Sequence, residues 1–63
     1  MSNYGEKLRT LRGSRTQEEV AKAVGISTSA YASYEQGTRV PKDQVKVRLA
    51  EYYRKSVAYI FFN

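Results

Sequence analysis

Between residues 17 and 36 the apolar side chains lie four residues apart before Gly25 and three apart near the end, the spacings of an α-helix. The apolar positions are Val20, Val24, Ile26, Tyr31 and Tyr34. Gly25 interrupts the pattern, and only glycine adopts a left-handed backbone without steric cost. The pattern therefore predicts two short helices separated by a sharp turn at Gly25.

Polar and small residues mark the ends of these two helices and the way they cross. Thr16 and Glu19 have the spacing of a capping box, in which each side chain accepts a hydrogen bond from a backbone N–H. Ser27 suits the start of the second helix and Gly37 its end. Ala21 is small enough for close crossing. Two such helices at a steep angle form a helix-turn-helix, whose second helix can lie in the DNA major groove.

The rest of the chain is also predicted to be helical. The further helices are expected at about residues 3 or 4 to 12, about residues 42 or 43 to 53, and residues 57 to 60. The first has Asn3 as a plausible N-cap, and the fourth has Val45, Leu49 and Tyr52 on its inner face. Apart from the aromatic tail, no stretch alternates with the period of a strand. At 63 residues, the chain is expected to be a single all-α domain, 1–63, with its helix-turn-helix at 17–36.

The charge distribution indicates the class of partner. Eleven basic residues face six acidic ones, for a net charge of +5, which suits nucleic acid or an anionic membrane. The basic residues before and after the two-helix unit include Arg9, Arg12, Arg15, Arg39, Lys42 and Lys46. The second helix of the unit has no positive charge. Phosphate contacts on both sides of a groove-inserted helix require such flanking, so double-stranded DNA is the favoured partner.

Several other functions are disfavoured by what the chain lacks. It has no cysteine and no histidine, so we expect no disulfide, metal site or cofactor. The carboxylates are dispersed and no glycine-rich phosphate loop is present, which argues against an enzyme or a small-molecule site. No apolar run is long enough to span a bilayer, and the N-terminus lacks a secretory signal. We expect a complete, cytoplasmic protein with no membrane partner.

A combination of motifs extends over nearly the whole chain. The motifs are Leu-Arg-Thr-Leu-Arg at 8–12, Thr-Gln-Glu-Glu-Val-Ala at 16–21, Val-Gly-Ile-Ser at 24–27, Tyr-Glu-Gln-Gly-Thr-Arg at 34–39 and Pro41. With them the chain resembles the Cro and cI-type (XRE) helix-turn-helix repressors of phages and bacteria. The resemblance implies a five-helix domain of the lambda-repressor type. It also implies a homodimer on a two-fold-symmetric operator, in the bacterial cytoplasm and associated with the nucleoid.

Three features depart from this family. The segment between Leu11 and Gln17 is shorter than in many relatives, so a tighter turn is expected there. Tyr31 occupies a core position that is most often aliphatic. Arg54 and Lys55 stand where relatives often have glycine, so the fourth helix lacks its usual left-handed stop and is free to run on.

The polar side of the second helix of the unit is the candidate for reading bases. Helical spacing places five residues opposite its apolar side: Thr28, Ser29, Ala32, Ser33 and Gln36. Thr28, Ser29 and Ser33 match the base readers of relatives by position, and Ala32 can touch a thymine methyl group. The alternative is an ordinary solvated face. Because these side chains are short, specificity should depend on water bridges, methyl contacts and DNA shape.

A second set of residues is expected to contact phosphates. It comprises Gln17, Ser27, Thr38, Arg39, Lys42 and Arg15. Gln17 lies at the amino end of a helix, where aligned N–H groups favour an anion. For the residues after Gly37, the alternative is a solvated loop.

Glu35 needs a separate explanation, because a carboxylate in a basic DNA-facing domain repels phosphate. It must point inward or be paired, and the family resemblance implies a structural ion pair with Arg12. Breaking a buried pair costs about 3–5 kcal/mol. Replacing Glu35 should therefore damage folding more than DNA contact.

The aromatic tail has two interpretations. It contains Tyr59, Ile60, Phe61 and Phe62. Part of it must close the core of so small a domain. Four large residues exceed what one short helix can bury, and the remainder indicates a homodimer contact.

Two functions remain open at this point. The first is sequence-specific binding of double-stranded DNA by a small transcriptional regulator, most simply a repressor of a palindromic operator. The second is a protein-interaction module, such as an antitoxin or an anti-repressor, that retains the fold. Flanking arginines and lysines favour the first, whereas the uncharged helix face and the apolar tail leave the second open.

Overall fold

The computed structural model describes residues 4–62, and this part of the chain contains five helices and no strand. They are α1 (Tyr4–Arg12), α2 (Gln17–Val24), α3 (Thr28–Gln36), α4 (Asp43–Tyr53) and α5 (Val57–Phe61). The prediction of an all-α fold is confirmed. The N-cap expected at Asn3 lies outside the described residues. No described helix has the length and apolar character needed to cross a membrane.

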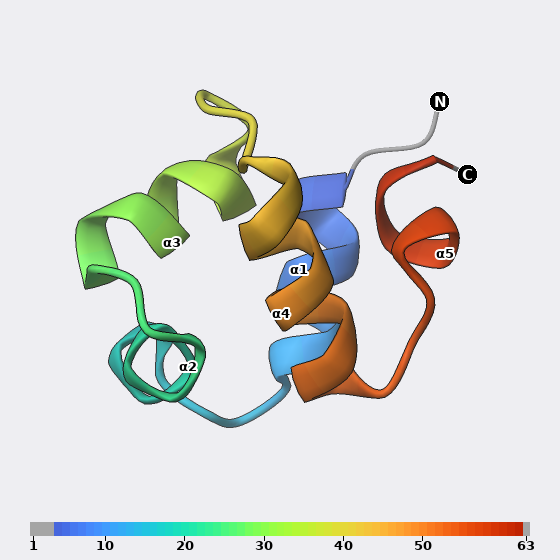
Figure 1. Ribbon diagram of the computed structural model, residues 1–63. Helices are drawn as coiled ribbons and strands as arrows, with labels where there is room; N and C mark the ends of the chain where they lie inside the picture. Colours follow the sequence, from blue (N-terminus) through green and yellow to red (C-terminus); the bar gives the residue numbers. More distant parts are fainter. Residues whose placement is uncertain (1–3, 63) are drawn as a thin grey trace.

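The helices are arranged so that α3 and α5 lie on opposite sides of α1 (Figure 1). Helix α2 packs against α3 and α4, and α4 packs against α5. All five helices are shorter than the roughly 12–15 residues at which an isolated helix becomes stable in water. Their stability therefore comes from packing against one another.

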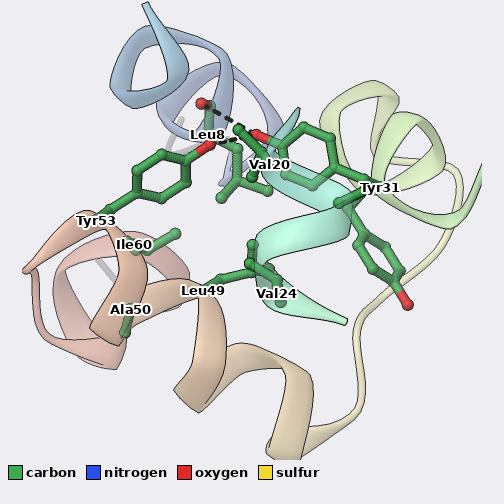
Figure 2. Packing of buried hydrophobic residues seen from close by; sticks show 10 residues of the cluster. Leu8, Val20, Val24, Tyr31, Leu49, Ala50, Tyr53 and Ile60 are labelled. Carbon is green, nitrogen blue, oxygen red and sulfur yellow. Dashed lines mark hydrogen bonds between the residues drawn. The ribbon is translucent and has the colours of Figure 1, made fainter. Parts of the chain in front are cut away.

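Each helix contributes at least one large, fully buried side chain to a common core (Figure 2). These residues are Leu8, Val20, Tyr31, Leu49 and Ile60. Burying a side chain of this size contributes about 1.5–3 kcal/mol. Losing any one helix would therefore expose core side chains of the other four.

The buried side of α4 is not made up of the residues expected there. Its buried residues are Leu49, Ala50 and Tyr53, while Val45 and Tyr52 are only partly buried. The prediction that Tyr52 lies on the inner face was therefore only approximate. Helical periodicity identifies a face, and Tyr52 and Tyr53 both lie near its edge.

The turn between α2 and α3 forms as the sequence predicts. Gly25 has φ 87° and ψ 32°, the left-handed conformation. The carbonyl oxygen of Ala21 accepts from the N–H of Gly25 at 2.8 Å and from that of Ile26 at 2.9 Å. The capping box of Thr16 and Glu19 is present at the start of α2. These bonds satisfy helix-end groups that would otherwise lack partners.

Helix α4 ends at Tyr53 although no glycine follows it. Arg54 itself adopts the left-handed conformation, with φ 58° and ψ 43°, and the N–H of Lys55 donates to the carbonyl of Ala50 at 2.9 Å. The chain thus reverses and lets α5 place Ile60 in the core. The sequence allowed α4 to continue past Tyr53, but the helix ends there. Packing of α5 imposes a backbone that costs a non-glycine residue about 1–2 kcal/mol.

We predict that Arg54→Gly stabilises the protein, because glycine relieves the left-handed strain. Glycine also loses more conformational entropy on folding, so the net gain should be about 0.5–1 kcal/mol. In a domain of this size that raises Tm by roughly 2–8 °C, measurable by circular dichroism. Lys55→Gly is the matched control and should not raise Tm. Equal or lower stability of Arg54→Gly would contradict the prediction.

Candidate nucleic-acid interface

The five candidate base-reading residues all lie on the side of α3 away from the core. Thr28, Ser29 and Gln36 are exposed, whereas Ala32 and Ser33 are half-buried. Tyr31 and Tyr34 occupy the opposite side of α3 and are buried. Ser27 caps the helix by accepting from the N–H of Ala30 at 3.0 Å. The outer face of α3 is therefore small, polar and uncharged.

Two hydroxyl groups on this face differ in what they can recognise. Ser33 Oγ donates to the carbonyl oxygen of Ser29 at 3.0 Å, so its oxygen is left to accept. The Ser29 hydroxyl has no such bond in the described part of the chain, so it can donate or accept. Ser29 is therefore the more versatile partner for a base edge.

The loop after α3 holds three of the six residues expected to contact phosphates. Thr38, Arg39 and Lys42 are exposed. The Tyr4 hydroxyl donates to the carbonyl of Arg39 at 2.8 Å and fastens the loop to α1. Thr38 Oγ1 donates to the carbonyl of Ser33 at 3.3 Å. The loop is thereby held at the C-terminal end of α3, with two cations on its surface.

Arg15, another residue expected to contact a phosphate, has several contacts within the protein. Its Nε donates to the carbonyl of Arg12 at 3.1 Å, and its Nη2 donates to that of Leu11 at 2.7 Å. Its guanidinium also lies over the rings of Tyr52 and Tyr53, at 5.1 and 5.3 Å from their centres. These contacts bind the end of α1 to the end of α4. Contact between Arg15 and a phosphate stays a prediction, since its Nη1 has no hydrogen bond in the described part of the chain.

The side chain of Gln17 is also hydrogen-bonded within the protein. Its amide nitrogen donates to Glu35 Oε1 at 3.0 Å. A primary amide has two N–H donors, so one remains for a phosphate. The sequence did not predict this bond, because it joins residues from two different helices.

The expected ion pair of Arg12 and Glu35 is present and is bidentate. Arg12 Nε donates to Glu35 Oε2 at 2.7 Å, and Arg12 Nη2 donates to Oε1 at 3.1 Å. The Glu35 side chain is 3% exposed. Burial alone would raise the pKa of this carboxyl, but the hydrogen bonds from Arg12 and Gln17 outweigh it and hold the pKa below its ordinary value. The pair connects α3 to α1, and Gln17 adds α2.

A buried pair of tyrosines connects α3 to α4, and sequence reasoning missed it. The hydroxyls of Tyr31 and Tyr53 are 2.6 Å apart, and the Tyr31 hydroxyl lies 3.4 Å from the carbonyl of Leu8 (Figure 2). Burial raises the pKa of Tyr31 far above its usual range. The signal in the sequence was a phenol at a position that is usually aliphatic, because a buried phenol needs a partner.

The tail divides between core and surface. Ile60 is fully buried, so it cannot contact a second protomer, and its place among the dimer residues is corrected. Phe61 is half-buried and its ring centre is 5.6 Å from that of Tyr4. Tyr59 and Phe62 are 45% and 69% exposed. These two rings are the most exposed of the four tail side chains.

Comparison of the sequence with known proteins identifies a family that it matches. Residues 3–58 match the family described as "Helix-turn-helix domain". Over 57 residues the chain is 39% identical to the cryptic phage CTXphi transcriptional repressor RstR of Vibrio cholerae. That alignment covers 87% of this chain and 51% of the relative, so the chain spans about half the length of that protein. No solved structure gives a significant match.

We predict that Glu35→Gln lowers the free energy of unfolding at pH 7 by about 3 kcal/mol, because it leaves Arg12 without its buried partner. The folded pKa of Glu35 is lowered, so its stabilising effect is present above the ordinary value of 4.5 and is lost as pH falls through the folded value. The difference between the two proteins should therefore shrink from about pH 5 to pH 3. Urea denaturation across this range measures it.

The control is Glu51→Gln, on the exposed side of α4. This change should alter stability by no more than about 0.5 kcal/mol at pH 7. If the free energies of unfolding of Glu35→Gln and the parent differ as much at pH 3 as at pH 7, the charge of Glu35 is not the source of the stabilisation.

Proposed function

The chain belongs to the helix-turn-helix domain family, and from this premise we propose that it binds double-stranded DNA sequence-specifically as a small transcriptional repressor. The main support is the arrangement around α3. Its exposed side is uncharged, and exposed Arg39 and Lys42 follow it. The similarity to a protein named as a transcriptional repressor adds to this. We propose binding without catalysis, in the bacterial cytoplasm and on the nucleoid, with no cofactor or small-molecule ligand.

In this proposal α3 lies in the major groove. With nine residues it is roughly 13 Å long, which suits a groove about 12 Å wide. Thr28, Ser29 and Ser33 contact base edges and Ala32 contacts a thymine methyl group. Gln36, at the far end, carries the amide that can pair with adenine.

Residues at the two ends of α3 contact the DNA backbone. Arg39, Lys42 and Thr38 follow the helix, and Ser27 precedes it. The free N–H of Gln17 contacts a phosphate from the start of α2. Since the reading side chains are short, much of the specificity comes from water bridges and DNA shape.

We further propose that the protein binds a palindromic operator as a homodimer through Tyr59, Phe62 and the edge of Phe61. The support is the exposure of the Tyr59 and Phe62 rings on and just after α5, which lies on the opposite side of α1 from α3 (Figure 1). Three lysines surround them: Lys7 and Lys55 lie over the Tyr59 ring, and Lys46 lies over Phe61 and Phe62. A two-fold contact brings these like charges together, so salt should favour dimer formation.

The alternative function is a protein-interaction module, and the same exposed rings favour it. Salt dependence distinguishes the two. A repressor that engages several phosphates loses affinity for DNA steeply with salt, with a log–log slope of about −0.9 per phosphate. A module that contacts only protein shows no such DNA binding.

We predict that Arg39→Gln weakens binding to preferred and random duplexes alike and reduces the salt slope by about 0.9 per protomer. Ser29→Ala should leave the slope unchanged and weaken only the preferred duplex, by about 1 kcal/mol. Fluorescence anisotropy across a salt series, on sites selected from a random pool, measures both. If Ser29→Ala keeps the sequence preference, direct reading by this hydroxyl is refuted.

We predict that Phe62→Ser weakens dimer formation at least about tenfold, because the contact loses most of the burial of a large ring. Sedimentation velocity over a range of protein concentrations measures this. Val47→Ser removes another exposed apolar residue, one that lies on α4, and is the control, since Val47 is 46% exposed. Equal effects of the two changes, or dimers that weaken with added salt, would argue against this surface.

A further inference from the structure

Two connections join α3 to the turn between α1 and α2, and Arg15 takes part in both. In the first, Glu35 on α3 is held by Arg12 at the end of α1. Arg12 Nη1 donates to the carbonyl of Arg15 at 2.8 Å, and Arg15 Nε donates back to the carbonyl of Arg12 at 3.1 Å. Each of the two arginine side chains therefore donates a hydrogen bond to the backbone carbonyl of the other arginine.

The second connection runs through the core. The Tyr31 side chain extends from α3 to meet the hydroxyl of Tyr53 on α4 (Figure 2). Tyr31 is fully buried and Tyr53 is 7% exposed. The Tyr53 ring is in turn covered by the guanidinium of Arg15. A continuous series of contacts thus leads from the turn to the middle of α3.

The physical consequence concerns how α3 is oriented. Helix α3 packs mainly against α1 and α2, and shares no extended packing with α4. The hydrogen-bonded hydroxyls of Tyr31 and Tyr53 therefore connect α3 and α4 across the core, although these two helices do not pack along each other. A buried hydroxyl without a partner is unfavourable, so the pair restricts the distance between Tyr31 and Tyr53. Because a tyrosine ring is rigid, fixing its hydroxyl also limits rotation of α3 about its axis.

We propose that Arg15, Tyr31 and Tyr53 are positioning residues that set the rotation of α3 and so its sequence discrimination. None of them lies on the exposed face of α3. This inference depends on the proposed DNA-binding function. Short side chains such as Ser29 tolerate little displacement, because a hydrogen bond weakens steeply when its geometry is lost.

Substitution of Arg15 separates positioning from phosphate contact. Arg15→Lys keeps the charge but loses the planar group that stacks on Tyr53 and donates to two carbonyls. Arg15→Gln removes the charge as well. A phosphate contact would lose about 0.9 of salt slope per protomer in Arg15→Gln and little in Arg15→Lys. A positioning residue would leave the slope unchanged and lose discrimination in both.

The experiment compares the parent protein with Arg15→Lys, Arg15→Gln, Tyr53→Phe and Tyr31→Phe. Tyr52→Phe is the matched control, because the Tyr52 hydroxyl has no hydrogen bond in the described structure. Affinity for a selected site and for a shuffled duplex is measured across a salt series, at a temperature where circular dichroism shows each variant folded. The first four variants should lower the ratio of the two affinities at least about 5-fold, the low end for one base pair. Tyr52→Phe should keep it.

The combined variant Tyr31→Phe/Tyr53→Phe should lose no more than Tyr31→Phe alone, because that single change already removes the bond to Tyr53 and the one to the carbonyl of Leu8. Amide chemical shifts of α3, recorded without DNA, should change in Tyr53→Phe and Arg15→Lys and not in Tyr52→Phe. The shifts test the inference even if one tyrosine variant unfolds.

The inference is overturned if folded Arg15→Lys and Tyr53→Phe keep the parent's affinity ratio and α3 shifts. It is also overturned if Arg15→Gln loses salt slope while the ratio stays constant. If the parent shows no salt-dependent DNA binding, the proposed function fails. In that case the α3 shifts still decide whether these residues orient the helix.

Discussion

The rest of the structure depends on one buried carboxylate. Glu35 is held by two bonds from Arg12 on α1 and one from Gln17 on α2, so three helices meet at a single charged group. A buried charge is tolerated only when it is paired and hydrogen-bonded, and its partners are therefore held in narrow limits of position. In a protein this small, that requirement determines where α3 lies relative to α1 and α2.

Helix α3 combines two opposite properties on its two sides. The inner side carries Tyr31, Tyr34 and Glu35, which are large or charged and firmly held. The outer side carries small hydroxyl and methyl groups that reach only a short way. Short groups read bases well only when the helix is held precisely, and long flexible readers would not need this. The firm inner anchors and the short outer readers are thus complementary.

Local signals explain why much of the fold could be predicted from the sequence. The capping box at Thr16 and the left-handed Gly25 act within one helical turn, so they do not depend on the rest of the chain. The end of α4 was different. Arg54 has no local preference for a left-handed backbone, and only the packing of α5 and Ile60 accounts for it.

The sequence by itself determined the five helices, the turn at Gly25 and the outer face of α3, because helical period and capping are short-range. Tertiary structure alone decided that Arg15 stacks on Tyr53, that Gln17 turns to Glu35, and that Ile60 is core. Long side chains take whichever partner lies within reach, and for these residues the partner comes from another helix. Periodicity gives the face on which a residue lies, but the neighbouring helices determine what it contacts.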